Sequence, residues 1–156
     1  GALASLTRLN LSRNQIGDEG MKAFYALSTG VLASLQWLDL DNNQFGDEGM
    51  KAFSGALSSG AMGSLQKLNL FSNQIGDDGM KAFSAALSSG SLASLRQLRL
   101  DSNQISDEGM KAFSGALSSG SLNSLTTLDI AFNPASDTAK NTMKAVASSR
   151  GIYLSI

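Results

Sequence analysis

Residues 65–73 read Leu-Gln-Lys-Leu-Asn-Leu-Phe-Ser-Asn, and this stretch decides the fold because its pattern, Leu-x-x-Leu-x-Leu-x-x-Asn, occurs five times. The copies begin at Leu6, Leu35, Leu65, Leu95 and Leu125. The first step is 29 residues, the next three are 30, and the last copy has Ile at its third apolar position. Self-similarity at a fixed period of this length is typical of a solenoid, in which each unit packs only on its neighbours.

Each copy of the pattern predicts a short strand followed by a tight turn. Leu68 and Leu70 alternate with polar residues, as a strand with one buried face requires. Asn73 marks the turn, where we expect it to adopt left-handed backbone and its side chain to bind backbone groups that leave the strand. Stacked in register, the asparagines would form a buried structural ladder, made of Asn14, Asn43, Asn73, Asn103 and Asn133.

The second half of each unit predicts a helix. Met80, Phe83 and Leu87 have the spacing of one apolar helix face. We expect Asp77 to cap the start of this helix and Gly90 to end it in a left-handed conformation. Gly79 would lie in the first helical turn, where glycine is costly, so a neighbouring unit is expected to approach closely at that point.

The composition excludes several classes of function. The chain has 156 residues, a net charge of −1, no cysteine and no histidine. These numbers remove thiolate and imidazole chemistry and zinc ligation by those residues. We therefore expect no enzyme activity, no cofactor and no metal site. The balanced charge and the lack of a long apolar run argue against nucleic acid and membrane as partners.

The unit Leu-x-x-Leu-x-Leu-x-x-Asn-x-Ile-Gly-Asp-Glu-Gly-Met-Lys-Ala-Phe resembles the ribonuclease-inhibitor-like leucine-rich repeats, which also occur in NOD-like receptors and Ran GTPase activators. The resemblance covers essentially the whole chain. It implies an α/β horseshoe with a parallel sheet on the concave face and helices on the convex face. It also implies a cytoplasmic protein whose concave surface binds another protein. The chain departs from the mammalian inhibitors by having asparagine at every ladder position and no cysteine.

The copies differ mainly in the strand half, at positions that should face solvent on the concave side. The helix halves are almost identical in units two to four. Trp and Arg are the residue types that most often anchor interfaces, and both occur among the variable positions. We therefore expect a protein partner to contact Arg8, Trp37, Asp39, Asp41, Lys67, Asn69, Phe71, Gln97, Arg99, Asp101 and Asp129.

Two other functions fit the same sequence. The near-identical helices would also suit a structural or scaffold array, natural or engineered, without a specific ligand. The family resemblance alone would suit a regulator of a GTPase or a nuclease. Phe132 lies in the last copy beside Pro134. Either packing under the end of the solenoid or contact with a ligand would explain it.

The two ends of the chain have different characters. Residues 134–156 depart from the repeat and predict a more polar helix, a stop at Gly151 and a final short strand, which together resemble a terminal cap. The start, from Gly1, matches the end of a helix in the later units. We expect residues 1–156 to form a single domain of about five units. Either further repeats precede it or its first unit mediates self-association.

Overall fold

The computed structural model describes residues 3–28 and 30–156, and strands alternate strictly with helices along this part of the chain. The strands are β1 (Arg8–Asn10), β2 (Trp37–Asp39), β3 (Lys67–Asn69), β4 (Gln97–Arg99), β5 (Thr127–Asp129) and β6 (Tyr153–Ser155). The helices are α1 (Asp18–Ser28), α2 (Asp47–Ser58), α3 (Asp77–Ser88), α4 (Asp107–Ser118) and α5 (Asp137–Arg150).

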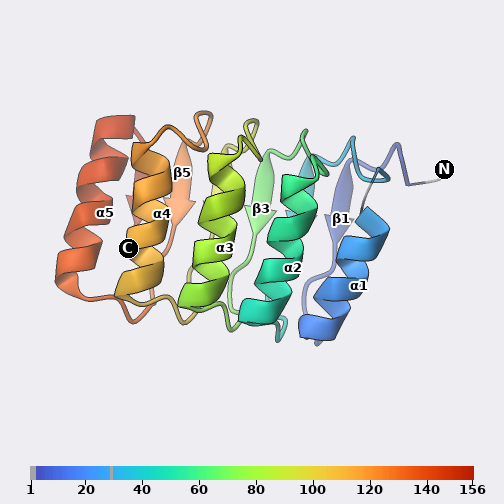
Figure 1. The fold of residues 1–156 in the computed structure, drawn as a ribbon, viewed down its shortest axis with the longest axis horizontal. Helices are drawn as coiled ribbons and strands as arrows, with labels where there is room; N and C mark the ends of the chain where they lie inside the picture. The colour runs from blue at the N-terminus through green and yellow to red at the C-terminus, as the bar shows by residue number, and fades with distance from the viewer. Residues whose placement is uncertain (1–2, 29) are drawn as a thin grey trace.

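The molecule has two layers, a parallel sheet and a row of helices that covers one of its faces (Figure 1). The strands follow one another in the order of the sequence, from β1 to β6. The register keeps equivalent residues of successive units side by side, so that Leu38 pairs with Leu68 and Leu68 with Leu98. This is the solenoid that the repeat predicts, and its uncovered sheet face is called the concave face below.

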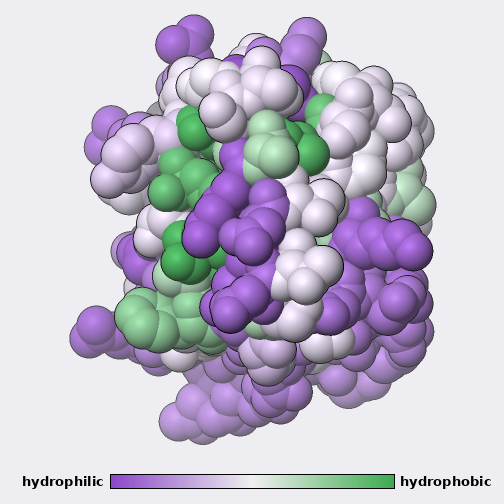
Figure 2. Space-filling model, turned by 90° about the vertical axis from the view of Figure 1, so that its left-hand side faces the viewer, coloured by the Kyte–Doolittle hydropathy of each residue, from purple (hydrophilic) through white to green (hydrophobic). Residues whose placement is uncertain are grey.

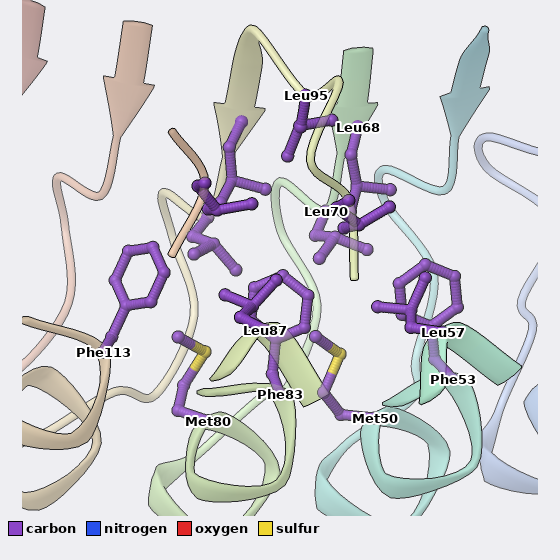
Figure 3. Close-up of a cluster of buried hydrophobic side chains, with 14 of the residues drawn as sticks. Met50, Phe53, Leu57, Leu68, Leu70, Met80, Phe83, Leu87, Leu95 and Phe113 are labelled. Atoms are coloured by element: carbon purple, nitrogen blue, oxygen red, sulfur yellow. The ribbon is translucent and has the colours of Figure 1, made fainter. Parts of the chain in front are cut away.

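The core is a strip between the two layers, to which the interior units contribute equivalent side chains (Figure 3). Met80, Phe83 and Leu87 lie on one face of α3 and are buried, as their spacing predicts. Phenylalanine rings of neighbouring helices pack in two pairs, with 6.5 Å between the ring centres of Phe24 and Phe53 and 6.2 Å between those of Phe83 and Phe113. Full burial of one such side chain stabilises the fold by about 1.5–3 kcal/mol.

The asparagines at the strand ends join consecutive units. The Nδ2 of Asn103 donates to the carbonyl oxygens of Leu100 in its own unit and Leu70 in the preceding unit, at 3.1 and 3.0 Å. Its Oδ1 accepts from the backbone N–H of Ile75 at 3.1 Å. Asn43, Asn73 and Asn133 are buried in the same way, whereas Asn14 in the first unit is exposed.

The turn itself differs from the sequence expectation in one respect. The left-handed residue is not the asparagine but the one before it, with φ angles of 52–57° at Arg13, Asn42, Ser72, Ser102 and Phe132. This placement aims the asparagine side chain inward, toward the backbone of the preceding unit.

The expectation that Asp77 caps its own helix is wrong. The N-cap of α3 is Gly76, and Asp77 is the first helical residue. The Oδ1 of Asp77 instead accepts from the backbone N–H groups of Ser106 and Gly109, at 2.9 and 2.8 Å, which begin the next helix. Asp18 and Asp47 make the equivalent contacts to α2 and α3. Each aspartate therefore caps the helix of the following unit.

This arrangement explains the glycine in the first turn of the interior helices. A Cβ atom at Gly79 would lie 2.8 Å from the Oδ1 of Asp47 and 3.0 Å from the Cβ of Met50. The equivalent atom at Gly109 would lie 2.6 Å from the Oδ1 of Asp77. The close approach that we expected is therefore made mainly by the capping aspartate of the preceding unit.

The one-residue deletion in the first unit shortens α1 to 11 residues, compared with 12 in α2. It also turns the end of the helix about its axis. Leu27 is 69% exposed, although the equivalent Leu57, Leu87 and Leu117 are buried, and Ser28 takes the buried position. A rotation of about 100° per residue accounts for this exchange.

The last unit ends the sheet with an apolar edge. Met143, Ala147 and Ile152 are buried, but Val146, Leu154 and Ile156 are only partly covered. An end-on view shows hydrophobic surface exposed at this end, bordered by hydrophilic side chains (Figure 2). Gly151 ends α5 with a φ of 65°, as its position predicts. In the described part of the chain, none of the helices has the length and apolar character needed to cross a bilayer.

Candidate functional site

The concave face is lined by the variable residues of the strands, because successive side chains point to opposite sides of a sheet. Leu38, Leu68 and Leu98 point into the core, and the residues on either side of each leucine point outward. The first outward row is exposed in β1 to β4 and consists of Arg8, Trp37, Lys67 and Gln97. The second row, one step along the strands, consists of Asn10, Asp39, Asn69, Arg99 and Asp129.

Trp37 is the centre of the first row. It is 37% exposed, and its register neighbours in β1 and β3 lie against its ring. The guanidinium carbon of Arg8 is 5.0 Å from the ring centre, and the ammonium nitrogen of Lys67 is 5.4 Å from it. Both distances lie within the range of cation–π attraction, about 0.5–1 kcal/mol each at an exposed site. The three side chains therefore support one another and keep the indole in place.

Three shallow hollows surround Trp37. One, of about 190 Å³, is lined by Arg8, Leu9, Asn10, Trp37 and Asp39. A second, of about 220 Å³, extends from Trp37 across β3 to Gln97 and Arg99. The third, of about 90 Å³, includes Gln36 and Gln66, two residues outside the set expected from the sequence. Their position just before the first outward row was the signal that could have identified them.

Three of the expected partner residues have a structural task in the second row. The Oδ1 atoms of Asp39, Asn69 and Asp129 each accept from the backbone N–H two residues further on, at 3.1–3.2 Å. This local bond stabilises the point where the chain leaves the strand, a role that Asp and Asn commonly take. Their side chains are half-buried, so only part of each is available to a partner.

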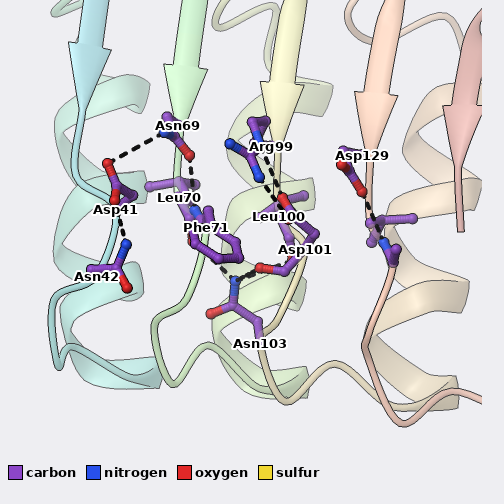
Figure 4. A network of polar contacts seen from close by, with 12 residues as sticks. Asp41, Asn42, Asn69, Leu70, Phe71, Arg99, Leu100, Asp101, Asn103 and Asp129 are labelled. Carbon is purple, nitrogen blue, oxygen red and sulfur yellow. Dashed lines mark hydrogen bonds and ion pairs between the residues drawn. The ribbon is translucent and has the colours of Figure 1, made fainter. Parts of the chain in front are cut away.

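Arg99 is the exception in that row (Figure 4). Its Nε and Nη2 donate to the two carboxylate oxygens of Asp101, at 3.1 and 2.8 Å. Its guanidinium carbon lies 4.8 Å from the centre of the Phe71 ring. Asp101, which the sequence places among the contact residues, is buried with 4% exposure. Within this cluster a partner could reach Arg99 and part of Phe71, whereas Asp101 is buried and fixes Arg99 through two hydrogen bonds.

The acids at the strand ends affect one another's protonation. Partial burial, and then a hydrogen bond with Asp41, raises the pKa of Asp39 to about 6. Burial also acts to raise the pKa of Asp41, but hydrogen bonds from Asp39 and Asn42 and the charges of Arg13 and Arg99 outweigh it and lower that pKa. Asp41 is therefore the more readily ionised acid of the pair, and Asp39 gains its negative charge as the pH rises through about 6.

The remaining outward residues lie apart from this centre. Phe132 is 82% exposed, so it does not pack under the last unit. Tyr153, in the first row of β6, is 75% exposed. Among residues 3–28 and 30–156, no group of three or more acidic residues is arranged to hold a metal ion. The face offers mixed charge and aromatic surface.

The sheet, the inward leucines and the asparagines at the strand ends define a class of proteins, the strand–helix solenoids. A model of the leucine-rich repeat matches residues 2–24, 31–54, 64–84 and 91–114, which together are more than half of the chain. The chain therefore belongs to the leucine-rich repeat family, with the α/β solenoid fold of that family. A search of the curated proteins gives no match by sequence.

Solved structures show the same fold. An internalin from Listeria monocytogenes is 27% identical, with a TM-score of 0.62 over 96% of this chain, which spans 34% of that protein. The tropomodulin C-terminal domain of Caenorhabditis elegans is 14% identical, with a TM-score of 0.72. The match covers 94% of this chain and 85% of that domain. The actin-binding site 2 of leiomodin-1 is 19% identical, with a TM-score of 0.71. The match covers 94% of this chain and 82% of that one.

Proposed function

We propose that residues 1–156 form a single protein-recognition domain that binds a protein partner on its concave face. One observation carries the proposal: the residues that vary between units gather on this face around an exposed Trp37, and three hollows surround that ring. The opposite, helical half repeats almost unchanged. A scaffold array without a ligand would not need its only tryptophan, flanked by two cations, on the variable side.

The composition of the face supports a protein as the ligand. Aromatic residues and arginine are enriched where protein interfaces are tightest, and here Trp37, Phe71 and Arg99 lie on adjacent strands or at their ends. The leiomodin-1 structure is named for an actin-binding site, so a domain of this fold serves protein binding there. The ribonuclease-inhibitor-like subclass and a cytoplasmic location, both implied by resemblance, belong to the same proposal.

A cross-linking experiment tests the proposed face. A photo-reactive amino acid at Gln97, in the first outward row, is expected to capture protein partners from an extract of the source cells. The same group at Lys51, on the exposed side of α2, serves as the matched control. The Trp37→Ala/Arg99→Ala variant of the Gln97 probe should lose the captured species. Capture that is the same at both positions, or unchanged in the variant, would contradict a concave binding face.

Self-association through the first unit is a second candidate, favoured by the surface at that end. β1 is an edge strand, and the apolar residues of its unit are only partly covered: Leu6, Leu9, Leu11, Ile16 and Phe24. Edge strands beside apolar surface are prone to pair with another copy. Light scattering should then show a mass that rises with concentration. A constant monomer mass up to millimolar concentration would exclude this candidate.

A further inference from the structure

The two cations beside Trp37 have no acidic partner in the described part of the chain. The ion pairs there are three between side chains of the helices and one between Arg99 and Asp101. Arg8 and Lys67 come from the strands on either side of β2, and both are exposed. Two positive charges are thus held close to one ring, and neither forms an ion pair within the described part of the chain.

The smallest hollow lies between these cations. It is lined by Arg8, Gln36, Trp37, Gln66 and Lys67, and its volume is about 90 Å³. Each of these side chains carries an N–H donor, and none is acidic. A carboxylate matches such a lining, because the guanidinium fork can donate two parallel hydrogen bonds to its two oxygens.

The acids of the concave face lie further along the strands. Asp39 and Asp41 follow Trp37 by two and four residues, which corresponds to about 7 and 13 Å along an extended chain. Asp129 and the Arg99–Asp101 pair lie at the same side of the sheet (Figure 4). The face is therefore positive where the strands begin and mainly negative where they end. An acidic group would be attracted to the first region and repelled from the second.

We propose that the hollow between Arg8, Trp37 and Lys67 receives an acidic side chain, Asp or Glu, from a peptide segment of the protein partner. This inference rests on the proposed function and adds the chemistry of the partner to it. The indole lies between the two cations and already restricts their side chains. Arg8 and Lys67 therefore lose little conformational freedom when the carboxylate binds. The strand ends, near Asp39 and Asp41, then contact neutral or basic residues of the same segment.

Trp37 is the only tryptophan of the chain, so its fluorescence reports binding at this position. The probe is an acetylated, amidated hexaglutamate peptide, with hexalysine and inorganic phosphate as comparisons. Hexaglutamate should give a saturable change that weakens as salt increases, because the contact is between exposed charges. The Arg8→Gln/Lys67→Gln variant should bind it at least tenfold more weakly. The Lys22→Gln/Lys51→Gln variant changes the net charge equally on the helices and should bind it normally.

Four results would overturn the inference: no saturable response to hexaglutamate, equal affinity in the Arg8→Gln/Lys67→Gln variant, a stronger response to hexalysine, or phosphate binding as tight as the peptide. Circular dichroism of each variant shows whether it is folded, which the exposure of all four side chains leads us to expect. The proposed function is tested separately by cross-linking. If that experiment supports the concave face and hexaglutamate has no effect, only the acidic segment is wrong.

Discussion

At the scale of single residues, the ladder asparagines join consecutive units through hydrogen bonds to the backbone. Asn103 satisfies carbonyl groups of two units and one backbone N–H. Asn103→Ala should lower the free energy of unfolding by about 1–3 kcal/mol, because these buried groups lose their partners. Asn14→Ala is the matched control, since Asn14 is exposed and its side chain donates to the carbonyl oxygen of Ser12 in its own unit. Urea denaturation that shows equal losses for the two variants would contradict this role.

Asp39 gives the fold a dependence on pH between about 4 and 6. Its pKa is raised in the folded state to about 6, so its protonated form is the one that folding favours. The stabilisation is complete below the unfolded pKa and is lost as the pH rises through 6. Asp39→Asn should therefore be more stable than the native chain at pH 8, by less than about 1 kcal/mol because the site is partly exposed. Asparagine keeps the acceptor for the N–H of Asp41.

The test compares unfolding of the native chain and Asp39→Asn at pH 5 and pH 8. The difference should be largest at pH 8 and shrink at pH 5, where the native carboxyl is mostly protonated. A difference of the same size at both values would assign it to packing rather than to charge. Asp129→Asn is the matched control, because Asp129 makes the same local hydrogen bond at the end of β5, three strands away from Asp39 in β2.

The same residue scale shows what the sequence could and could not predict about the site. Outward positions follow from strand alternation, so the exposure of Arg8, Trp37 and Lys67 follows from the pattern. Alternation does not reveal that Arg99 folds back over Phe71 and onto Asp101. That contact depends on the length and torsions of one side chain, and it leaves Asp101 buried. The hydrogen bonds of Asp39 and Asn69 at the strand ends are local and could have been predicted.

At the scale of helices, the caps join one unit to the next. Asp77 binds the first turn of α4, and its pKa is lowered because hydrogen bonds from Ser106 and Gly109 outweigh the effect of its partial burial. Asp77→Ala should cost about 1 kcal/mol, as for the loss of an N-cap. Asp78→Ala removes the same charge from the neighbouring exposed position and should cost less. Thermal unfolding measures the loss of stability in both variants. Equal losses would mean that Asp77 acts through its charge alone and not through its hydrogen bonds to the next helix.

Helix length was predictable from the repeat, but its consequence for packing was not. The deletion in α1 appears in the sequence as a unit of 29 residues. Because a helix turns about 100° per residue, losing one residue moves every later side chain to another face. The exposure of Leu27 and the burial of Ser28 follow from this rotation. The capping aspartates escaped prediction for a different reason: their partners lie about 30 residues away and are backbone groups without a sequence signal.

Restoring the missing residue should restore the packing. One alanine inserted between Tyr25 and Ala26 would give α1 the length of α2 and turn Leu27 toward the core in place of Ser28. Burial of leucine is worth about 1.5–3 kcal/mol, so a gain of about 1 kcal/mol in unfolding free energy is expected after side-chain entropy is lost. The same insertion between Ser54 and Gly55 should destabilise the chain, since Leu57 is already buried. Urea denaturation of both variants tests the pair.

At the scale of the whole molecule, the order of the strands is the most predictable feature. Each unit packs on its neighbours alone, and in the structure the strands pair in the order β1 to β6. The repeat therefore specifies the topology without any long-range inference. The separation of charge on the concave face is equally visible in the sequence once the strands are aligned. The sequence could not show how far the end units cover their apolar residues, because that depends on side-chain packing.

A solenoid of this kind should not open uniformly, because its end units have fewer neighbours than its interior units. The amides of Leu11 and Leu70 are a matched pair: each donates to a carbonyl of the next strand, at 2.8 and 2.9 Å. Leu11 is only partly buried, whereas Leu70 is fully buried between two units. Hydrogen exchange at Leu11 should be faster by about tenfold or more, a difference of about 1.4 kcal/mol in opening free energy. If both amides exchange at the rate of global unfolding, the six strands open as one cooperative unit, which would contradict local opening of the first strand.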